Sequence, residues 1–118
     1  MNPSVRVPCV MLMFVLAACR STGPAHEALE QARMGSRAVQ FKLFAEAFFR
    51  FQKAAALEPS NAKYLNNLAV LAESQGRFEE AVQWYQKALA LAPGNKKIKD
   101  NYEKLQAYLK PRAPKPPA

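Results

Sequence analysis

Few side chains in this sequence could take part in covalent chemistry or hold a metal ion. The chain has two cysteines, Cys9 and Cys19, and one histidine, His26. A metal site needs several ligands at matched spacing, and a single histidine beside Glu27 does not supply them. The sequence also has no glycine-rich phosphate loop, and only Cys19 stands in a context that suggests a modification. We therefore expect a protein that is not an enzyme and that carries no metal and no cofactor.

An apolar segment at the N-terminus predicts an export signal. Residues 9–18 are all apolar, but they fall short of the roughly 20 residues that a membrane-spanning helix needs. The segment ends in Leu16-Ala-Ala-Cys19, which resembles the lipobox of bacterial lipoprotein precursors. This resemblance implies a signal peptide over residues 1–18 and a diacylglycerol on Cys19, with further acyl chains such as palmitate that hold the protein firmly on a membrane. The alternatives are an ordinary secretory signal with a coincidental cysteine and an uncleaved helix.

The residues that follow the cysteine predict where the protein goes. Arg20, and not aspartate, follows Cys19, and by resemblance to enterobacterial sorting this favours the outer membrane, with the protein facing the periplasm. Residues 19–27 are mostly small or polar and predict a flexible tether between the lipid and the folded part.

Composition and an internal repeat predict an all-α fold. The chain is rich in helix-forming residues and has only four glycines. When the sequence is shifted by 34 positions, ten of the eighteen residues in the range 44–61 are identical to their equivalents in 78–95. A period of 34 residues is that of the tetratricopeptide repeat, a helix-turn-helix unit, and residues 62–95 resemble this family closely. The matching positions are Leu65, Leu68, Ala69, Gly76, Ala81, Tyr85, Ala88 and Pro93.

The resemblance implies a short helical solenoid with two repeats and a capping helix. Repeat 1 covers residues 28–61, repeat 2 covers residues 62–95, and the capping helix covers residues 96–110. The last segment, residues 111–118, is rich in proline and lysine and is expected to be a disordered tail. We expect five helices in total.

The family's signature residues have mechanical roles. Ala81 and Ala88 let neighbouring helices approach closely, and Tyr85 is expected to fill the space between them. Gly76 can adopt the left-handed conformation that ends a helix. In repeat 1, Lys42 occupies the position of this glycine. We therefore expect the first helix of repeat 1, or its turn, to be displaced.

In this family the first helix of each repeat lines a concave groove for a peptide. Asn67 and Lys97 coincide with two of the five residues that some relatives use to hold a C-terminal carboxylate. The other three positions hold Ala32, Ser36 and Asn101, so the resemblance does not support that activity. We predict a general peptide-binding groove, and the alternative is a solvated polar surface without a ligand. The predicted site residues are Ala32, Ser36, Lys63, Asn66, Asn67, Val70, Glu73, Lys97, Asn101 and Lys104, with Leu29, Arg33, Val39 and Asp100 at further groove positions.

Five phenylalanines between positions 41 and 51 are more than one helix face can bury. Phe44, Phe48 and Phe51 share a face and are predicted to be core residues. Phe41 and Phe49 point elsewhere and are candidates for an aromatic contact with a protein. Two repeats are fewer than the three or so that a stable solenoid needs, so a homo-oligomer or a partner would supply the missing burial.

The charge distribution restricts the class of partner. The formal net charge is +8, and from position 96 onward seven Lys or Arg residues stand against Asp100 and Glu103. An exported protein rarely meets nucleic acid, so we expect no nucleic-acid binding. Instead we expect a membrane-anchored protein–protein interaction module, an adaptor or scaffold for an unidentified partner in the bacterial cell envelope. The alternatives are an assembly factor for a secretin or pilus system, and a structural spacer whose basic tail contacts the cell wall.

Overall fold

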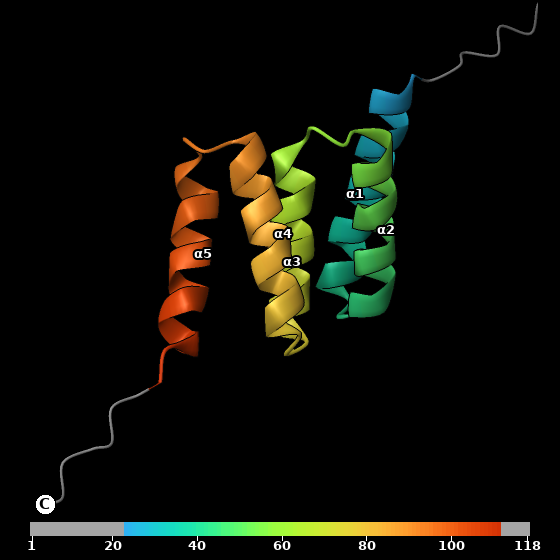
Figure 1. Ribbon diagram of the computed structural model, residues 1–118. Coiled ribbons are helices and arrows are strands. Elements are labelled where there is room, and N and C mark those ends of the chain that lie inside the picture. The colour runs from blue at the N-terminus through green and yellow to red at the C-terminus, as the bar shows by residue number, and fades with distance from the viewer. Residues whose placement is uncertain (1–22, 112–118) are drawn as a thin grey trace, which may run out of the picture.

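The computed structural model describes residues 23–111, and within that range the chain forms five α-helices and no strand. The predicted all-α architecture, with two helical hairpins and a final helix, is confirmed. Two hairpins stand side by side, and the last helix lies beside the second (Figure 1). The predicted signal peptide, its Cys19 and the tail from residue 112 lie outside the described residues. The helices are α1 (Pro24–Gln40), α2 (Phe44–Leu57), α3 (Ala62–Ser74), α4 (Phe78–Leu91) and α5 (Lys96–Leu109).

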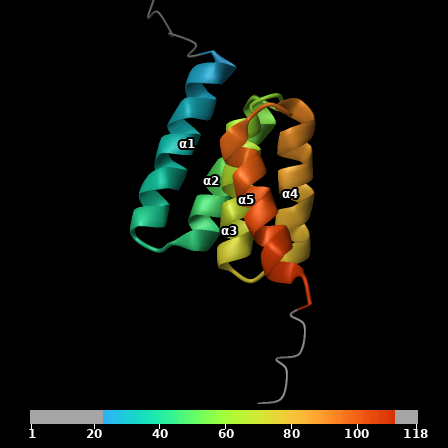
Figure 2. The same ribbon diagram turned by 90° about the vertical axis from the view of Figure 1, so that its left-hand side faces the viewer.

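The helices run alternately up and down, which gives the molecule two distinct ends. One end holds the start of α1 and the α2–α3 and α4–α5 loops, and we call it the loop end (Figure 1). The opposite end holds the α1–α2 and α3–α4 turns, and we call it the turn end. Seen from the α5 side, α1 and α4 lie on opposite sides of the molecule (Figure 2).

Small residues let the two helices of each hairpin pack closely. Ala81 and Ala88 on α4 are fully buried, and Tyr85 between them is only 1% exposed. This is the packing that the sequence predicted for these three residues. In the first hairpin, Gly35 on α1 faces the ring of Phe51 on α2, so that any side chain at this position would meet the ring.

Helix α1 begins earlier than predicted. Residues 24–27 were assigned to the flexible tether, but the helix starts at Pro24, with Gly23 as its N-cap. Proline is favourable at the first position of a helix because its missing N–H is not needed there, and Glu27 in the first turn complements the helix dipole. The predicted tether therefore extends at most to residue 23.

The turn of the first hairpin is not displaced, and that prediction was wrong. Lys42 has a φ of 58° and Gly76, its equivalent 34 residues later, has a φ of 72°. The hydrogen bonds also correspond, because Leu43 N donates to Ala38 O and Arg77 N donates to Ala72 O, both at 2.9 Å. Lys42 therefore adopts the left-handed conformation that the second hairpin assigns to a glycine.

Aromatic contacts join the successive units. The rings of Phe48 on α2 and Trp84 on α4 meet edge to face with their centroids 6.5 Å apart, and the Arg77 guanidinium lies 4.4 Å from the centre of the Phe48 ring. Tyr85 on α4 packs against Tyr102 on α5 with a centroid distance of 5.9 Å. These contacts hold the hairpins and α5 in one stack. The predicted core positions Phe48 and Phe51 are buried, and Phe44 is partly buried.

Charged and polar side chains lie on both outer faces of the stack. On α1, Glu30 and Gln31 stand where α3 buries Tyr64 and Leu65, and Arg50 Nη1 donates a hydrogen bond to Gln31 Oε1 at 3.2 Å. On α5, ion pairs join Lys96 to Asp100 at 2.7 Å and Lys99 to Glu103 at 3.9 Å. Polar outer faces are typical of the terminal units of a solenoid.

Candidate functional site

Three adjoining hollows form a continuous groove along α1, α3 and α5. The first, of about 450 Å³, and the second, of about 240 Å³, share Ser36, Phe51 and Asn67. The second and the third, of about 310 Å³, share Val70. The hollows therefore follow one another along the same surface. We call this surface the concave groove. It is lined by Leu29, Ala32, Arg33, Ser36, Arg37, Val39, Gln40, Phe51, Asn67, Val70, Leu71, Glu73, Ser74, Tyr85, Asn101 and Lys104.

The structure brings seven of the ten predicted site residues together in the concave groove. These seven come from three helices that are separated in the sequence but adjacent in the stack. Their role in binding a ligand stays a prediction. They are Ala32, Ser36, Asn67, Val70, Glu73, Asn101 and Lys104.

Two predicted site residues are not free to contact a ligand with their side chains. Asn66 is only 5% exposed, and its Oδ1 accepts a hydrogen bond from Asn101 Nδ2 at 3.2 Å. This bond links α3 to α5, so Asn66 positions Asn101 and does not itself face the groove. Ala32 is also buried and forms only part of the groove wall.

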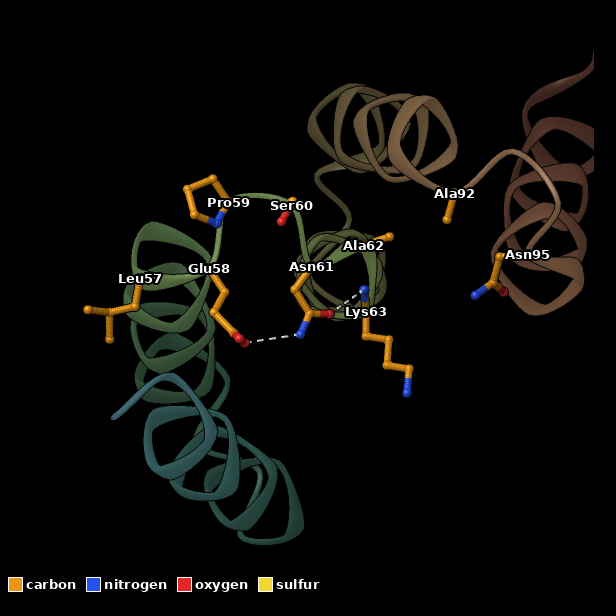
Figure 3. Close-up of a pocket in the computed structure, with 9 residues that line it drawn as sticks. All are labelled: Leu57, Glu58, Pro59, Ser60, Asn61, Ala62, Lys63, Ala92 and Asn95. Atoms are coloured by element: carbon orange, nitrogen blue, oxygen red, sulfur yellow. Dashed lines mark hydrogen bonds between the residues drawn. The ribbon is translucent and has the colours of Figure 1, made fainter. Parts of the chain in front are cut away.

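Lys63 and Lys97 lie near the loop end, in the first turns of α3 and α5, and both are exposed. Lys63 belongs to a different hollow of about 610 Å³, formed by the α2–α3 and α4–α5 loops (Figure 3). There Asn61 caps α3 by accepting from Lys63 N at 3.1 Å, and Asn61 Nδ2 donates to Glu58 Oε2 at 3.2 Å (Figure 3). The polar groups of this loop-end hollow are thus used to fix the loop, and Lys63 is separate from the concave groove.

The middle of the concave groove is apolar. Val39 on α1 and Val70 on α3 are both about two-fifths exposed, at 38% and 42%, and Phe51 and Leu71 form the floor between them. Leu29 adds a further exposed apolar side chain on α1. Exposed apolar side chains that line a concave surface are typical of a binding site, because a ligand can cover them.

On the α5 side of the concave groove, hydrogen bonds fix the polar side chains of Glu73 and Asn101. The Tyr85 hydroxyl donates to Glu73 Oε2 at 3.0 Å. Burial, together with this bond and the negative charge of Glu73, raises the pKa of Tyr85 well above its usual value, so the hydroxyl stays a neutral donor. Asn101 is held by Asn66, and Lys104 is exposed at the edge. Glu73 and Asn101 are therefore held in place before any ligand arrives.

The cations of the concave groove stand at its two ends. Arg33 and Arg37 are one turn apart on α1, and Lys104 is on α5. Arg33 pairs with Glu30 at 2.6 Å, whereas neither Arg37 nor Lys104 forms an ion pair within residues 23–111. Glu73 is the one carboxylate among the lining residues of the three hollows. The groove thus has a positive balance.

The sequence argument missed several groove residues. Phe51 and Tyr85 come from the second helices of the hairpins and reach the groove between the first helices. Arg37 lies between the carried-over positions Ser36 and Val39, and its spacing of four from Arg33 was the signal that could have found it.

Phe41 and Phe49 are exposed, as predicted. Phe41 at the α1–α2 turn is 70% exposed, and Phe49 on α2 is less so. The Lys53 ammonium lies 4.6 Å from the centre of the Phe49 ring and shields part of it. That either residue contacts a protein stays a prediction.

In the described part of the chain, residues 23–111, no group of acidic, histidine or cysteine side chains is placed to hold a metal ion. Within the same range no helix has the length and apolar character that a membrane crossing requires.

Comparisons with known proteins identify one segment of the chain. Residues 62–95 match the family model described as tetratricopeptide repeat. No curated protein matches the chain. Forty-two solved chains match it. One is the TPR domain of Arabidopsis OM64, which is 21% identical, with 74% of this chain and 100% of that chain covered and a TM-score of 0.39. The matched segment 62–95 contains α3, α4 and the loop that leads to α5.

Proposed function

We propose, on the premise that residues 62–95 are a tetratricopeptide repeat, that this chain is a membrane-anchored adaptor of the bacterial cell envelope. Such repeats form protein–protein interaction modules, and their helical scaffold is typical of proteins without catalytic activity. In our proposal the concave groove holds a segment of a partner protein, and the lipid on Cys19 confines the complex to a membrane.

The observation that carries this proposal is the continuity of the concave groove. Its three hollows follow one another across α1, α3 and α5, with apolar side chains in the middle and polar side chains at the ends. An extended peptide can place its apolar side chains against Val39 and Val70 and its backbone near the amides of Asn67 and Asn101. Hydrogen bonds already fix Glu73 and Asn101 on the α5 side, so these two residues need little ordering on binding.

Capture of the partner from host membranes tests the groove. We would compare the wild-type chain with Val70→Arg, which places a charge in the apolar middle, and with the control Gln83→Arg, which adds the same charge on the exposed side of α4. Val70 is 42% exposed, so an arginine can extend into solvent without disturbing the core. The proposal expects a crosslinked partner with the wild type and the control, and its loss with Val70→Arg. Equal capture by all three chains would contradict the groove assignment.

The lipid anchor is a separate part of the proposal. It is supported by the sequence Leu16-Ala-Ala-Cys19, and α1 begins five residues after this cysteine. Five residues span at most about 18 Å, so an anchor at Cys19 would keep the groove close to the membrane surface and raise the local concentration of adaptor there. We place the protein in the outer membrane, facing the periplasm, because Arg20 follows the cysteine.

Metabolic labelling with a palmitate analogue tests the anchor. Cys19→Ser should abolish the label and release the protein from membranes, whereas Cys9→Ser should leave both unchanged. Labelling that survives Cys19→Ser, or an unlabelled wild type, would reject the lipid anchor. Neither result would affect the groove.

A further inference from the structure

We propose that the loop end of the molecule rests on the headgroups of an anionic phospholipid membrane. The inference rests on one part of the proposed function, the attachment of the N-terminus to a membrane. It adds which end of the folded part faces that membrane and which lipids this end contacts. It is supported by the place where the chain enters the fold, by the lysines of the loop end and by exposed apolar side chains among them.

The chain enters the fold at the loop end. Helix α1 begins there at Pro24, at the same end of the stack as the α2–α3 and α4–α5 loops (Figure 1). Cys19 lies five residues before Pro24, so an attachment at this cysteine holds the start of α1 within about 18 Å of the membrane. The turn end stands farther away by the length of a helix, which is about 20 Å for the 14 residues of α5. Of the two ends, the loop end is therefore the one that faces the headgroups.

Within residues 23–111, basic side chains outnumber acidic ones at the loop end but not at the turn end. Each end consists here of its loops and caps and of the nearest four residues of every helix. The loop end then carries four lysines and two carboxylates, which are Lys63, Lys96, Lys97, Lys99, Glu27 and Glu58. The turn end carries four basic side chains and as many carboxylates, the latter being Glu46, Glu73, Glu79 and Glu80. An anionic surface therefore attracts the loop end more strongly than the turn end.

The lysines of the loop end oppose the helix dipoles, so helix stability does not explain them. Helices α3 and α5 begin at the loop end, and neither has an acidic residue in its first turn. Lys63, Lys96 and Lys97 stand there instead, although a positive charge is unfavourable near the N-terminus of a helix. Helices α2 and α4 begin at the turn end and have glutamate, the favourable charge, in their first turns. An anionic headgroup beside α3 and α5 would interact favourably with both the lysines and the helix N-termini.

Exposed apolar side chains lie among these lysines. Leu91 at the end of α4 is 45% exposed, and Pro59 and Pro93 in the two loops are exposed as well. The same loops form the loop-end hollow of about 610 Å³, and Lys63 lines it (Figure 3). Segments that lie on a membrane surface combine lysines with apolar side chains that enter the headgroup layer. We expect a headgroup phosphate beside Lys63, with the leucine and the prolines in contact with the apolar part of the lipid.

This orientation leaves the concave groove accessible to a partner. Val39 lies in the last turn of α1 and Glu73 in the last turn of α3, so this part of the groove lies toward the turn end. A partner can reach it from the aqueous side while lipid covers the loop end. The sequence predicted Lys63 and Lys97 as groove residues, and their place at the loop end gives them a different role.

Fluorescence quenching in vesicles tests which end meets the membrane. The full chain is reconstituted into vesicles of phosphatidylcholine, with or without phosphatidylglycerol, where the acyl groups or the apolar residues 9–18 attach its N-terminus. A fluorescent amino acid replaces Ser60 at the loop end or, in a second protein, Gln75 at the turn end, and both positions are exposed. A lipid with a nitroxide on its headgroup quenches the fluorophore only when the two are close.

Two charge-reversal variants identify the lysines that matter. The loop-end variant carries Lys63→Glu and Lys97→Glu. The control carries Lys42→Glu and Lys110→Glu at the turn end, so its net charge changes by the same amount. Glutamate is favourable in the first turn of a helix, so the loop-end variant should fold as the wild type does, which circular dichroism checks.

In vesicles with phosphatidylglycerol we expect strong quenching at position 60 and little at position 75. One lysine near an anionic surface changes the ratio of docked to free loop ends about fivefold, so reversal of two lysines should lower this ratio by about tenfold or more. Quenching at position 60 should therefore fall in the loop-end variant and in neutral vesicles, and also at high salt because exposed charges are screened. The control should keep the quenching of the wild type.

Equal quenching at positions 60 and 75 would overturn the inference. Quenching at position 60 that is the same in neutral vesicles, or that falls as much in the control as in the loop-end variant, would overturn it as well. Failure of the proposed function gives different results. An unlabelled wild type in the palmitate experiment rejects the lipid anchor, but residues 9–18 still attach the chain to the vesicles for this test. Partner capture that is insensitive to Val70→Arg rejects the groove and leaves the quenching pattern as expected.

Discussion

Replacing Lys42 with glycine should stabilise the protein, because the backbone at this position is left-handed. Lys42 has a φ of 58°, and the equivalent residue in the second hairpin is a glycine with a φ of 72°. For a residue with a side chain, the left-handed region costs roughly 1–2 kcal/mol. Glycine removes this cost, but its greater freedom in the unfolded chain costs about 0.4–1 kcal/mol.

The balance predicts that Lys42→Gly raises the free energy of unfolding by about 0.5–1 kcal/mol. For a domain of this size, 1 kcal/mol corresponds to a shift in Tm of roughly 4–8 °C, so we expect an increase of about 2–8 °C. Thermal unfolding followed by circular dichroism measures the shift. Lys42→Ala is the matched control, because it removes the charge but keeps a β-carbon and should give no comparable increase.

The second hairpin supplies the reciprocal test. A β-carbon added at Gly76 would meet no atom within 4 Å, so Gly76→Ala changes only the backbone preference. It should lower Tm by an amount similar to the gain from Lys42→Gly. The reasoning is refuted if Lys42→Gly lowers Tm, or if Lys42→Ala raises it as much as glycine does.

Three further predictions concern the core and the hydrogen bonds that order the groove. Gly35→Ala should lower the free energy of unfolding by about 1 kcal/mol, because the new β-carbon would lie 2.9 Å from the Phe51 ring. The overpacking cost of roughly 1–3 kcal/mol exceeds the gain of about 1 kcal/mol in helix propensity. A rise in Tm would contradict this. Asn66→Ala should lower the free energy of unfolding, measured with a denaturant, by about 1–2 kcal/mol and should make Asn101 more mobile, because it removes the 3.2 Å hydrogen bond between α3 and α5. An unchanged unfolding midpoint would show that this bond contributes nothing. Tyr85→Phe should be less stable than the wild type at neutral pH, and the difference should shrink as the pH rises above 10. The pKa of Tyr85 is raised above 10.0 in the folded state, so the tyrosine ionises first in the unfolded state. The wild type therefore loses stability as the pH rises through this range. Urea unfolding at several pH values checks this, and a difference that stays constant up to strongly alkaline pH would count against it.

The helical architecture could be predicted because the repeat carries its own evidence. Identical residues 34 positions apart serve the same packing, so Ala81 and Ala88, which repeat Ala47 and Ala54, could be assigned to the core from the sequence. The resemblance to the repeat family added Tyr85 between them. The start of α1 could not be predicted in the same way. The small residues of segment 19–27 suggested a tether, but Pro24 is a good first residue of a helix and Glu27 favours its first turn.

The candidate site was predicted in part, for a physical reason. Positions on the first helices were carried over from the resemblance to the repeat family, and the structure places Asn67 and Val70 among the lining residues of the groove. Whether a side chain on such a helix faces the groove or the next helix depends on its neighbours, and Asn66 turned out to be bonded to Asn101. Likewise, the floor formed by Phe51 depends on how far α2 reaches between α1 and α3, which no spacing along the chain reports.

The turn of the first hairpin shows how tertiary packing can override a local preference. Lysine at position 42 argued for a displaced turn, because a residue with a side chain disfavours a positive φ. The observed turn nevertheless has the same backbone bonds as the glycine turn at position 76. The packing of α1 on α2 fixes where the chain must reverse, and Lys42 accommodates it.

Site-specific photocrosslinking tests most directly whether the concave groove is the surface that holds a partner. A photoreactive amino acid would be placed at Asn67 in the groove and, in a second protein, at Gln83 on the exposed side of α4, and each would be irradiated in host cells. Our account predicts a discrete crosslinked partner from position 67 and none from position 83. A partner crosslinked from position 83 and absent from position 67 would contradict it.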